Sequence, residues 1–182
     1  PGIFNGAQGV GLYRTEIPFM IRSSFPSEEE QVAVYTQVLA AYRGKPVHMR
    51  TLDVGGDKPL PYFPVENEAN PALGWRGIRF TLDNSQLLMT QLRAMIRAGS
   101  EPGNLRNLIP MVSSTGELDS FRELLDDALT KLRAEGFEVK RPPLGVMVEV
   151  PAAISQIPLW SGKLDFISIG SNDLSQYLLA LD

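Results

Sequence analysis

Residues 144–182, "LGVMVEVPAAISQIPLWSGKLDFISIGSNDLSQYLLALD", contain two apolar runs separated by a short helical segment. The runs LGVMVEV and FISI do not alternate between apolar and polar residues, which predicts strands buried on both faces. Residues 152–159 are predicted to form a short helix interrupted at Pro158, and another helix is predicted after the SND turn. Strand, helix and strand in this order favour a parallel sheet covered by helices.

The same alternation extends towards the N-terminus. Further strands are predicted over residues 10–13, 46–57 and 107–112, and further helices over 27–44, 85–98 and 115–135. The first of these helices has a capping box, in which Ser27 is followed three residues later by Glu30. Both an open doubly wound sheet and a (β/α)8 barrel fit five such strands. Because a complete barrel takes about 250 residues, this chain is expected to hold only part of one.

Composition limits the class of protein. A hydrophobic content of 43% over 182 residues provides for one sizeable core, so a single unit over residues 1–182 is expected. The net charge of −4 argues against a nucleic-acid surface or a polybasic membrane surface. No cysteine is present, and no apolar stretch approaches the roughly 18 residues of a membrane span. A cytoplasmic protein that binds neither nucleic acid nor membrane is expected.

Two carboxylates follow neighbouring predicted strands. Glu149 and Asp173 lie 24 residues apart, which is about one βα unit, so both should stand at the carboxyl ends of adjacent strands. The residues around them include no histidine or cysteine. Mg²⁺ binds through one or two protein carboxylates and leaves its other positions to water and substrate. These two residues are therefore candidate magnesium ligands.

Arginines occupy the corresponding positions of the two N-terminal strands. Arg14 and Arg50 would supply forked donors for a phosphate or a carboxylate on the opposite side of the same rim. The connection over residues 55–75 is long and Pro-rich, and connections of that length in compact domains tend to be functional. Lys58 and Arg76 lie in and beside it. A metal together with arginines predicts a small, multiply anionic substrate.

Plainer interpretations exist for each of these residues. A single glutamate at a strand end is often solvated or salt-bridged, and Arg14 has Glu16 beside it. Asp173 or Ser171 is also a suitable N-cap for the last helix. The joint placement at successive strand ends favours a functional site. His48, the one histidine, is predicted to be a packed or supporting residue and not a nucleophile.

Six stretches resemble a known family: GVGLYRTE, RTLDVGGDKPLPYF, NPALGWRGIRFTLD, IPMVSS, GVMVEVPAA and FISIGSNDLSQYLLALD. In order and spacing they are similar to the phosphoenolpyruvate (PEP)-binding domain of enzyme I of the bacterial phosphotransferase system. The stretch EIPFMIRSSFPSEEEQ is similar to the nitrogen-related paralogue in particular. The resemblance covers essentially all of the chain. It implies a parallel (β/α)8 TIM-barrel type of fold, here incomplete, with about five of the eight βα units.

The resemblance also implies an activity. In that family the barrel binds PEP and Mg²⁺, a histidine on another domain takes the phosphoryl group, and a small carrier protein receives it, with release of pyruvate. Arg14 and Arg50 match the arginines that hold the phosphate, and Asn172 matches a residue that contacts the substrate beside the metal. Glu149 and Asp173 match the two magnesium ligands.

Two further positions match the family, namely Arg76 with an active-site arginine and Lys58 with a loop lysine near the substrate. The family's phosphohistidine and its proton-donating cysteine have no counterpart among these residues, so no catalytic residue is expected here. The chain is expected to be a piece of a phosphotransferase that is inactive by itself. Its two unpaired sheet edges favour a homodimer.

Two alternatives remain open. Pyruvate phosphate dikinase and PEP synthase use a similar barrel on the same substrate, although the stretches SSFPSEEEQ and GGDKPLPYF favour the enzyme I branch. This region is alternatively a dimerisation module that binds no substrate.

Overall fold

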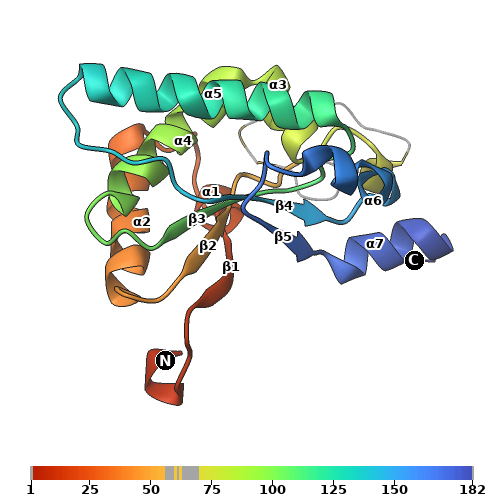
Figure 1. The fold of residues 1–182 in the computed structure, drawn as a ribbon, viewed down its shortest axis with the longest axis horizontal. Coiled ribbons are helices and arrows are strands. Elements are labelled where there is room, and N and C mark those ends of the chain that lie inside the picture. The colour runs from red at the N-terminus through yellow and green to blue at the C-terminus, as the bar shows by residue number, and fades with distance from the viewer. Residues whose placement is uncertain (1, 56–59, 61, 63–69, 182) are drawn as a thin grey trace.

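A computed structural model describes residues 2–55, 60, 62 and 70–181. Its five strands form one sheet in the order β1-β2-β3-β4-β5, and every neighbouring pair is parallel. The strands are β1 (Val10–Arg14), β2 (Val47–Arg50), β3 (Leu105–Ile109), β4 (Leu144–Val148) and β5 (Phe166–Ile169). A doubly wound sheet reverses its strand order at a switch point, whereas a barrel keeps it sequential. The order observed here therefore confirms an incomplete barrel, curled and open on one side (Figure 1).

Helices connect the strands and cover the convex face of the sheet (Figure 1). The α-helices are α1 (Glu16–Met20), α2 (Glu28–Ala41), α3 (Ile78–Asp83), α4 (Ser85–Gly99), α5 (Thr115–Ala134), α6 (Pro151–Gln156) and α7 (Ser171–Leu179). The short 3-10 helices are η1 (Ile3–Asn5), η2 (Pro71–Leu73) and η3 (Ile157–Trp160). Among the described residues no helix is both long enough and apolar enough to cross a membrane.

Local sequence explains where the helices begin. The Ser27 hydroxyl accepts from the Glu30 amide, and the Glu30 carboxylate accepts from the Ser27 amide, so the predicted capping box is confirmed. Ser114 and Glu117 form a second capping box at the start of α5. Helix α3 was not predicted, because it has only six residues and is separated from α4 by Asn84.

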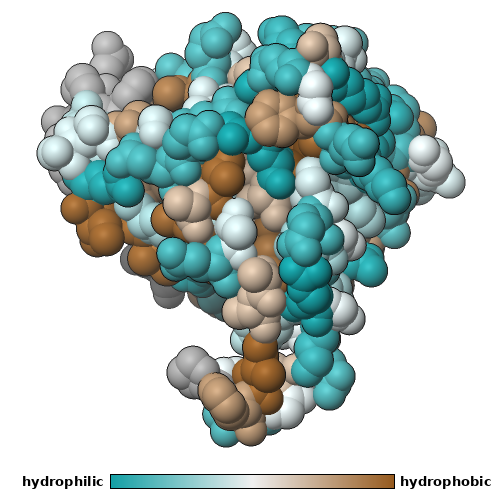
Figure 2. All heavy atoms as spheres, turned by 90° about the vertical axis from the view of Figure 1, so that its left-hand side faces the viewer, coloured by the Kyte–Doolittle hydropathy of each residue, from teal (hydrophilic) through white to brown (hydrophobic). Residues whose placement is uncertain are grey.

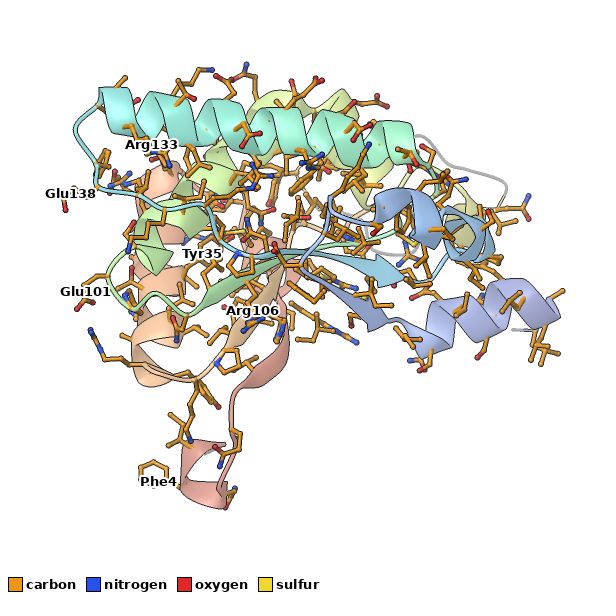
Figure 3. All side chains as sticks on the ribbon, viewed as in Figure 1. Phe4, Tyr35, Glu101, Arg106, Arg133 and Glu138 are labelled. Atoms are coloured by element: carbon orange, nitrogen blue, oxygen red, sulfur yellow. The ribbon has the colours of Figure 1, made fainter. Side chains whose placement is uncertain are left out.

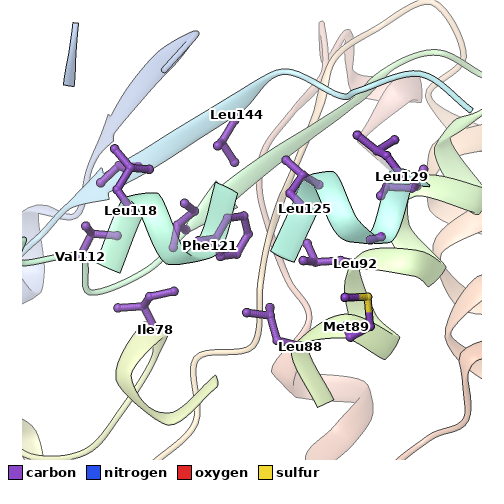
Figure 4. Packing of buried hydrophobic residues seen from close by; sticks show 14 of the residues in the cluster. Ile78, Leu88, Met89, Leu92, Val112, Leu118, Phe121, Leu125, Leu129 and Leu144 are labelled. Atoms are coloured by element: carbon purple, nitrogen blue, oxygen red, sulfur yellow. The ribbon is translucent and has the colours of Figure 1, made fainter. Parts of the chain in front are cut away.

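The main core lies between the sheet and helices α4 and α5. Leu88 and Leu92 of α4, Phe121 and Leu125 of α5 and Leu144 of β4 belong to one cluster, and all five side chains are 0–1% exposed (Figure 4). Burial of one such side chain contributes roughly 1.5–3 kcal/mol. This packing holds the strands in register, and the register decides which side chains meet at their carboxyl ends.

The two faces of β2 have different roles. Val47 and Met49 are buried against the helices, so His48 and Arg50 point to the concave face. The strand predicted over residues 46–57 is too long, because β2 ends at Arg50. Arg50 lies opposite Arg14, which ends β1. The concave face thus receives an arginine where the first two strands end.

The ends of the sheet are less covered than its middle. Ile167 and Ile169 of β5 are 49% and 67% exposed on the outer face. The N-terminal segment with η1 projects from the body, and the surface view from that side shows it as a narrow extension (Figure 2). Phe4 within it is exposed and points away from the rest of the protein (Figure 3).

Candidate functional site

Arg50, at the carboxyl end of β2, is buried among acidic side chains. Its Nη2 lies 2.5 Å from Oε1 of Glu16 and 3.0 Å from Oδ2 of Asp53. Nη1 lies 3.8 Å from the sulfur of Met147 on β4. Only 4% of the Arg50 side chain is exposed. The arginine is therefore held in a fixed orientation on the concave side of the strand end.

Arg76 reaches the same place from the long connection. Gly55 and Arg76 form an isolated antiparallel bridge, and a Cβ at Gly55 would lie 2.2 Å from the Trp75 carbonyl oxygen. Gly55 also has a φ of +100°, so this close approach of two backbones requires glycine. The Arg76 guanidinium then lies 3.2 Å from both Asp53 and Asp173. Burial opposes its charge, but Asp53 and Asp173 outweigh that effect and raise the pKa of Arg76.

Glu149 directly follows β4 and is 1% exposed. Its Oε1 accepts the backbone N–H of Met111 at 2.8 Å, whereas its Oε2 has no hydrogen-bond partner among the described residues. Met111 has a φ of +60°, a conformation that costs about 1–3 kcal/mol for a residue with a side chain. A Cβ at Gly170 would lie 2.7 Å from the unpartnered Oε2. The absence of a Cβ at Gly170 thus leaves room for this carboxylate oxygen, for which the described part of the chain supplies no donor.

The charge state of Glu149 reflects this environment. Burial raises the pKa of Glu149 to about 7, and the negative charges of Asp53 and Asp173 act in the same direction. The Met111 amide and Arg50 oppose this shift. Gly170, one residue after β5, lies against Glu149, one residue after β4, and Arg76 pairs with both Asp53 and Asp173. Glu149 and Asp173 therefore lie at one pole of the sheet, as the spacing predicted.

Among the described residues, the buried cluster contains more acidic than basic groups. Its carboxylates are Glu16, Asp53, Glu149 and Asp173, and its buried guanidinium groups are those of Arg50 and Arg76. Buried charge without compensation is costly, so such a cluster favours a bound cation or proton. No group of three or more His, Cys, Asp or Glu side chains in the described part of the chain is arranged to hold a metal by itself. The two carboxylates Glu149 and Asp173 instead match a cation that completes its coordination with other ligands.

The remaining predicted residues have different positions. Arg14 lies beside Arg50 in the register of β1 and β2 but is exposed. Asn172, in the first turn of α7, is exposed as well. Lys58 lies outside the described residues. His48 is packed, as predicted: its Nδ1 lies 3.0 Å from the Val10 carbonyl oxygen and its ring meets Phe166 edge-to-face.

Several plainer interpretations are wrong. Glu16 pairs with Arg50 and not with its sequence neighbour Arg14. Helix α7 has Gly170 at its N-cap position and no side-chain cap, so neither Ser171 nor Asp173 caps it. Asp173 lies within the first turn and accepts from Arg76.

Sequence reasoning did not identify Asp53 as part of the site. Its carboxylate is fully buried and lies within 3.2 Å of both Arg50 and Arg76. The available signal was its position three residues after Arg50, within the same motif. Met111 was also not identified, because its contribution is a backbone N–H.

A groove of about 720 Å³ opens beside this cluster between η2, α6 and α7. Met111 and Tyr177 are among its lining residues, together with Ala72 and Arg79. The Tyr177 hydroxyl donates to the Ala72 carbonyl and so ties α7 to the end of the long connection. The charged cluster is thus adjacent to a space large enough for a small molecule.

Comparison with known proteins identifies the family. Residues 3–182 match the model described as "PEP-utilising enzyme, PEP-binding domain". The chain is 53% identical over 175 residues to "Phosphoenolpyruvate-dependent phosphotransferase system" of Escherichia coli K12, covering 96% of this chain and 23% of the relative. It is 48% identical over 181 residues to "Phosphoenolpyruvate-protein phosphotransferase" of Listeria monocytogenes, covering 99% of this chain and 32% of the relative. The chain therefore spans about a quarter to a third of the length of these relatives. It belongs to the family of PEP-utilising enzymes, as a member of their PEP-binding domain.

Proposed function

We propose that the chain is the PEP-binding part of a cytoplasmic PEP-protein phosphotransferase, which transfers the phosphoryl group of PEP to a histidine on another domain and then to a small carrier protein. The names of the relatives support this activity. The observation that carries the proposal is the buried cluster at one pole of the sheet, in which Arg50 and Arg76 stand beside Glu149 and Asp173. Phosphoryl transfer requires charge neutralisation and alignment, and little covalent chemistry from the protein.

The arginines would bind the anionic part of PEP. Arg50 is oriented by Glu16 and Asp53, and Arg14 is exposed on the adjacent strand where it is free to approach a ligand. A forked guanidinium pairs with two phosphate oxygens at once. Asn172 and Lys58 are further proposed contacts, on the grounds of their match to the family.

Glu149 and Asp173 would hold Mg²⁺. The unpartnered Oε2 of Glu149, the room left by Gly170 and the excess of carboxylates support a cation at this place. When bound, the ion would neutralise charge on the phosphate and on the enolate left after transfer. The protein's own part is to place both carboxylates at one pole of the sheet and to hold Arg50 aligned beside them.

Calorimetry tests this proposal. Titration of PEP in the presence of Mg²⁺ should release or absorb heat with the wild-type chain, and the heat should be lost in Glu149→Ala and in Arg50→Ala. Arg93→Ala, which changes an arginine on the helix surface, is the matched control and should bind as wild type. Absence of binding by a folded wild-type chain would instead favour a module that serves only in assembly.

We further propose the nitrogen-related branch. The chain is 53% and 52% identical to two relatives of which it covers 23%, and 45–48% identical to relatives of which it covers 31–32%. The chain is thus more similar to the relatives of which it covers the smaller share, which are the longer proteins. This supports the nitrogen-related branch, whose members carry an additional domain. A nucleotide-binding domain in the same gene would point to the dikinase or PEP synthase instead.

The isolated chain is proposed to be inactive in transfer. Its one histidine, His48, is packed against Phe166 and bonded to Val10, so it is not placed as a phosphoryl acceptor. Incubation with PEP, Mg²⁺ and a carrier protein should give no turnover above background. Measurable phosphorylation of His48 or of the carrier would contradict this.

A homodimer is also proposed. Strands β1 and β5 are the edges of the described sheet, and Ile167 and Ile169 expose apolar surface at one of them. Light scattering at high protein concentration should show a species larger than a monomer. A monodisperse monomer would argue against it.

A further inference from the structure

A buried chain of polar side chains joins helix α4 to the strand end that carries Arg50. Gln91 lies on the inner side of α4 and is only 2% exposed. Burying a carboxamide is costly unless it is hydrogen-bonded. The Gln91 Oε1 accepts the Leu52 backbone N–H at 2.8 Å, and its Nε2 donates to Thr15 Oγ1 and to the Tyr35 hydroxyl, both at 3.1 Å. The whole amide group is therefore used.

Thr15 completes the connection. It is fully buried, and its hydroxyl donates to the backbone carbonyl of Arg50 at 2.7 Å while it accepts from Gln91. One side-chain hydroxyl and one carboxamide thus contact the backbone at two positions, Arg50 and Leu52. Tyr35, on the inner side of α2, extends the same chain to a second helix (Figure 3).

The position of these contacts has a simple structural cause. The Thr51 N–H donates to the Leu108 carbonyl of β3, so the Arg50 carbonyl and the Leu52 N–H face the other way, towards β1. Strand β1, however, ends at Arg14, and the chain turns into α1. The strand ladder cannot satisfy these two backbone groups. Thr15 and Gln91 supply side-chain partners where the strand is absent.

The residues fixed in this way carry the charged cluster. Leu52 directly precedes Asp53, which pairs with Arg50 and Arg76. Thr15 directly precedes Glu16, whose carboxylate lies 2.5 Å from Arg50. The hydrogen bonds of Gln91 and Thr15 therefore hold the backbone beside both members of the Arg50–Glu16 pair. They do so from the helix side of the sheet.

We propose that Gln91, acting with Thr15, is a positioning residue for Arg50 and Asp53, and through them for binding of the anionic substrate. This inference rests on the proposed function, in which Arg50 binds PEP. Gln91 does not touch the substrate; it sets the direction in which the Arg50 guanidinium points. A small misplacement of a binding group by a distant mutation costs up to about 100-fold in rate.

The test uses the full-length phosphotransferase with PEP as the varied substrate. Gln91→Leu should lower kcat/KM for PEP by roughly 10- to 100-fold. Thr15→Val, which keeps the shape but removes the hydroxyl, should give a similar loss, and Thr15→Ser should recover most of the activity. If Gln91→Leu does not fold, the comparison of Thr15→Val with Thr15→Ser still tests the inference.

The matched control is Asn104→Leu. The Asn104 amide is likewise buried and donates to the carbonyls of Leu39, Tyr42 and Lys45, but it lies just before β3, at the amino ends of the strands. Asn104→Leu should lower the melting temperature about as much as Gln91→Leu does, and should leave kcat/KM for PEP close to the wild-type value. An equal loss of kcat/KM in Asn104→Leu and Gln91→Leu would show a merely structural role and overturn the inference.

Hydrogen exchange separates this inference from the proposed function. The Leu52 amide should exchange faster in Gln91→Leu than in wild type, whatever the substrate, and unchanged exchange would overturn the proposed link. If wild-type protein does not use PEP at all, the proposed function fails. If wild type uses PEP and Gln91→Leu is equally active, only the positioning role fails.

Discussion

Two clusters of ion pairs in this protein use the same chemistry in different surroundings. On the helix surface, Arg93 and Arg97 pair with Glu28, Glu29 and Glu135 at 2.6–2.7 Å. At the strand ends, Arg50 and Arg76 pair with Glu16, Asp53 and Asp173 at 2.5–3.2 Å. Both clusters contain more carboxylates than arginines.

Solvent access distinguishes them. The side chains of Glu29 and Glu135 are 74% and 47% exposed, so water and salt screen the excess negative charge. The side chains of Arg50, Asp53 and Arg76 are 0–4% exposed, so water and salt screen these charges far less. The buried charges at the strand ends therefore depend more strongly on their partners than the charges of the surface cluster do.

The largest effect is expected from Arg50→Ala. It leaves Glu16 and Asp53 as buried carboxylates without this partner, and breaking a buried pair costs about 3–5 kcal/mol. Urea unfolding at pH 7 measures the loss. A cost no larger than that of Arg93→Ala would show that burial does not distinguish the two clusters.

An intermediate effect is expected from Glu149→Gln. The pKa of Glu149 is raised from 4.5 to about 7, so the folded state binds this proton more tightly than the unfolded state. The corresponding stabilisation is complete below pH 4.5 and is lost as the pH rises to about 7. It amounts to about 3 kcal/mol at most.

The measurement compares unfolding free energies of wild type and Glu149→Gln between pH 4.5 and 8. Glu149→Gln should lack this part of the pH dependence of the unfolding free energy. Its stability relative to wild type should therefore be higher at pH 8 than at pH 4.5. Mg²⁺ should reduce the slope in wild type, because a cation favours the ionised carboxylate. Identical pH profiles for both proteins would contradict the raised pKa.

The smallest effect is expected on the surface. Arg93→Ala removes pairs with Glu28 and Glu135, and because the Glu135 side chain is 47% exposed and screened by solvent, the loss of unfolding free energy should be smaller than for Arg50→Ala. The difference from wild type should shrink in 1 M NaCl, while the cost of Arg50→Ala should change little. A salt-independent loss would indicate that packing of the arginine stem, and not its charge, stabilises this region.

Prediction from the sequence succeeded where the signal is local. The capping box of Ser27 and Glu30 involves residues three positions apart, and the apolar runs of the strands are continuous. The spacing between Glu149 and Asp173 predicted both at one pole, because a βα unit returns the chain to the same side of the sheet. The pairing of Glu16 with Arg50 was not accessible in this way, since Glu16 begins α1 whereas Arg50 ends β2, 34 residues further along the chain.

By itself, the sequence determined the class of fold, the approximate elements and the residue types that stand at the strand ends, since hydrophobic periodicity and turn residues act over short distances. Only the tertiary structure decided that Asp53 joins Arg50 to Arg76, that one oxygen of Glu149 has no donor among the described residues, and that Gln91 bonds to the backbone after β2. These contacts depend on which strands and helices become neighbours. The physical reason is that charge and hydrogen bonding act through space, between groups that burial brings together.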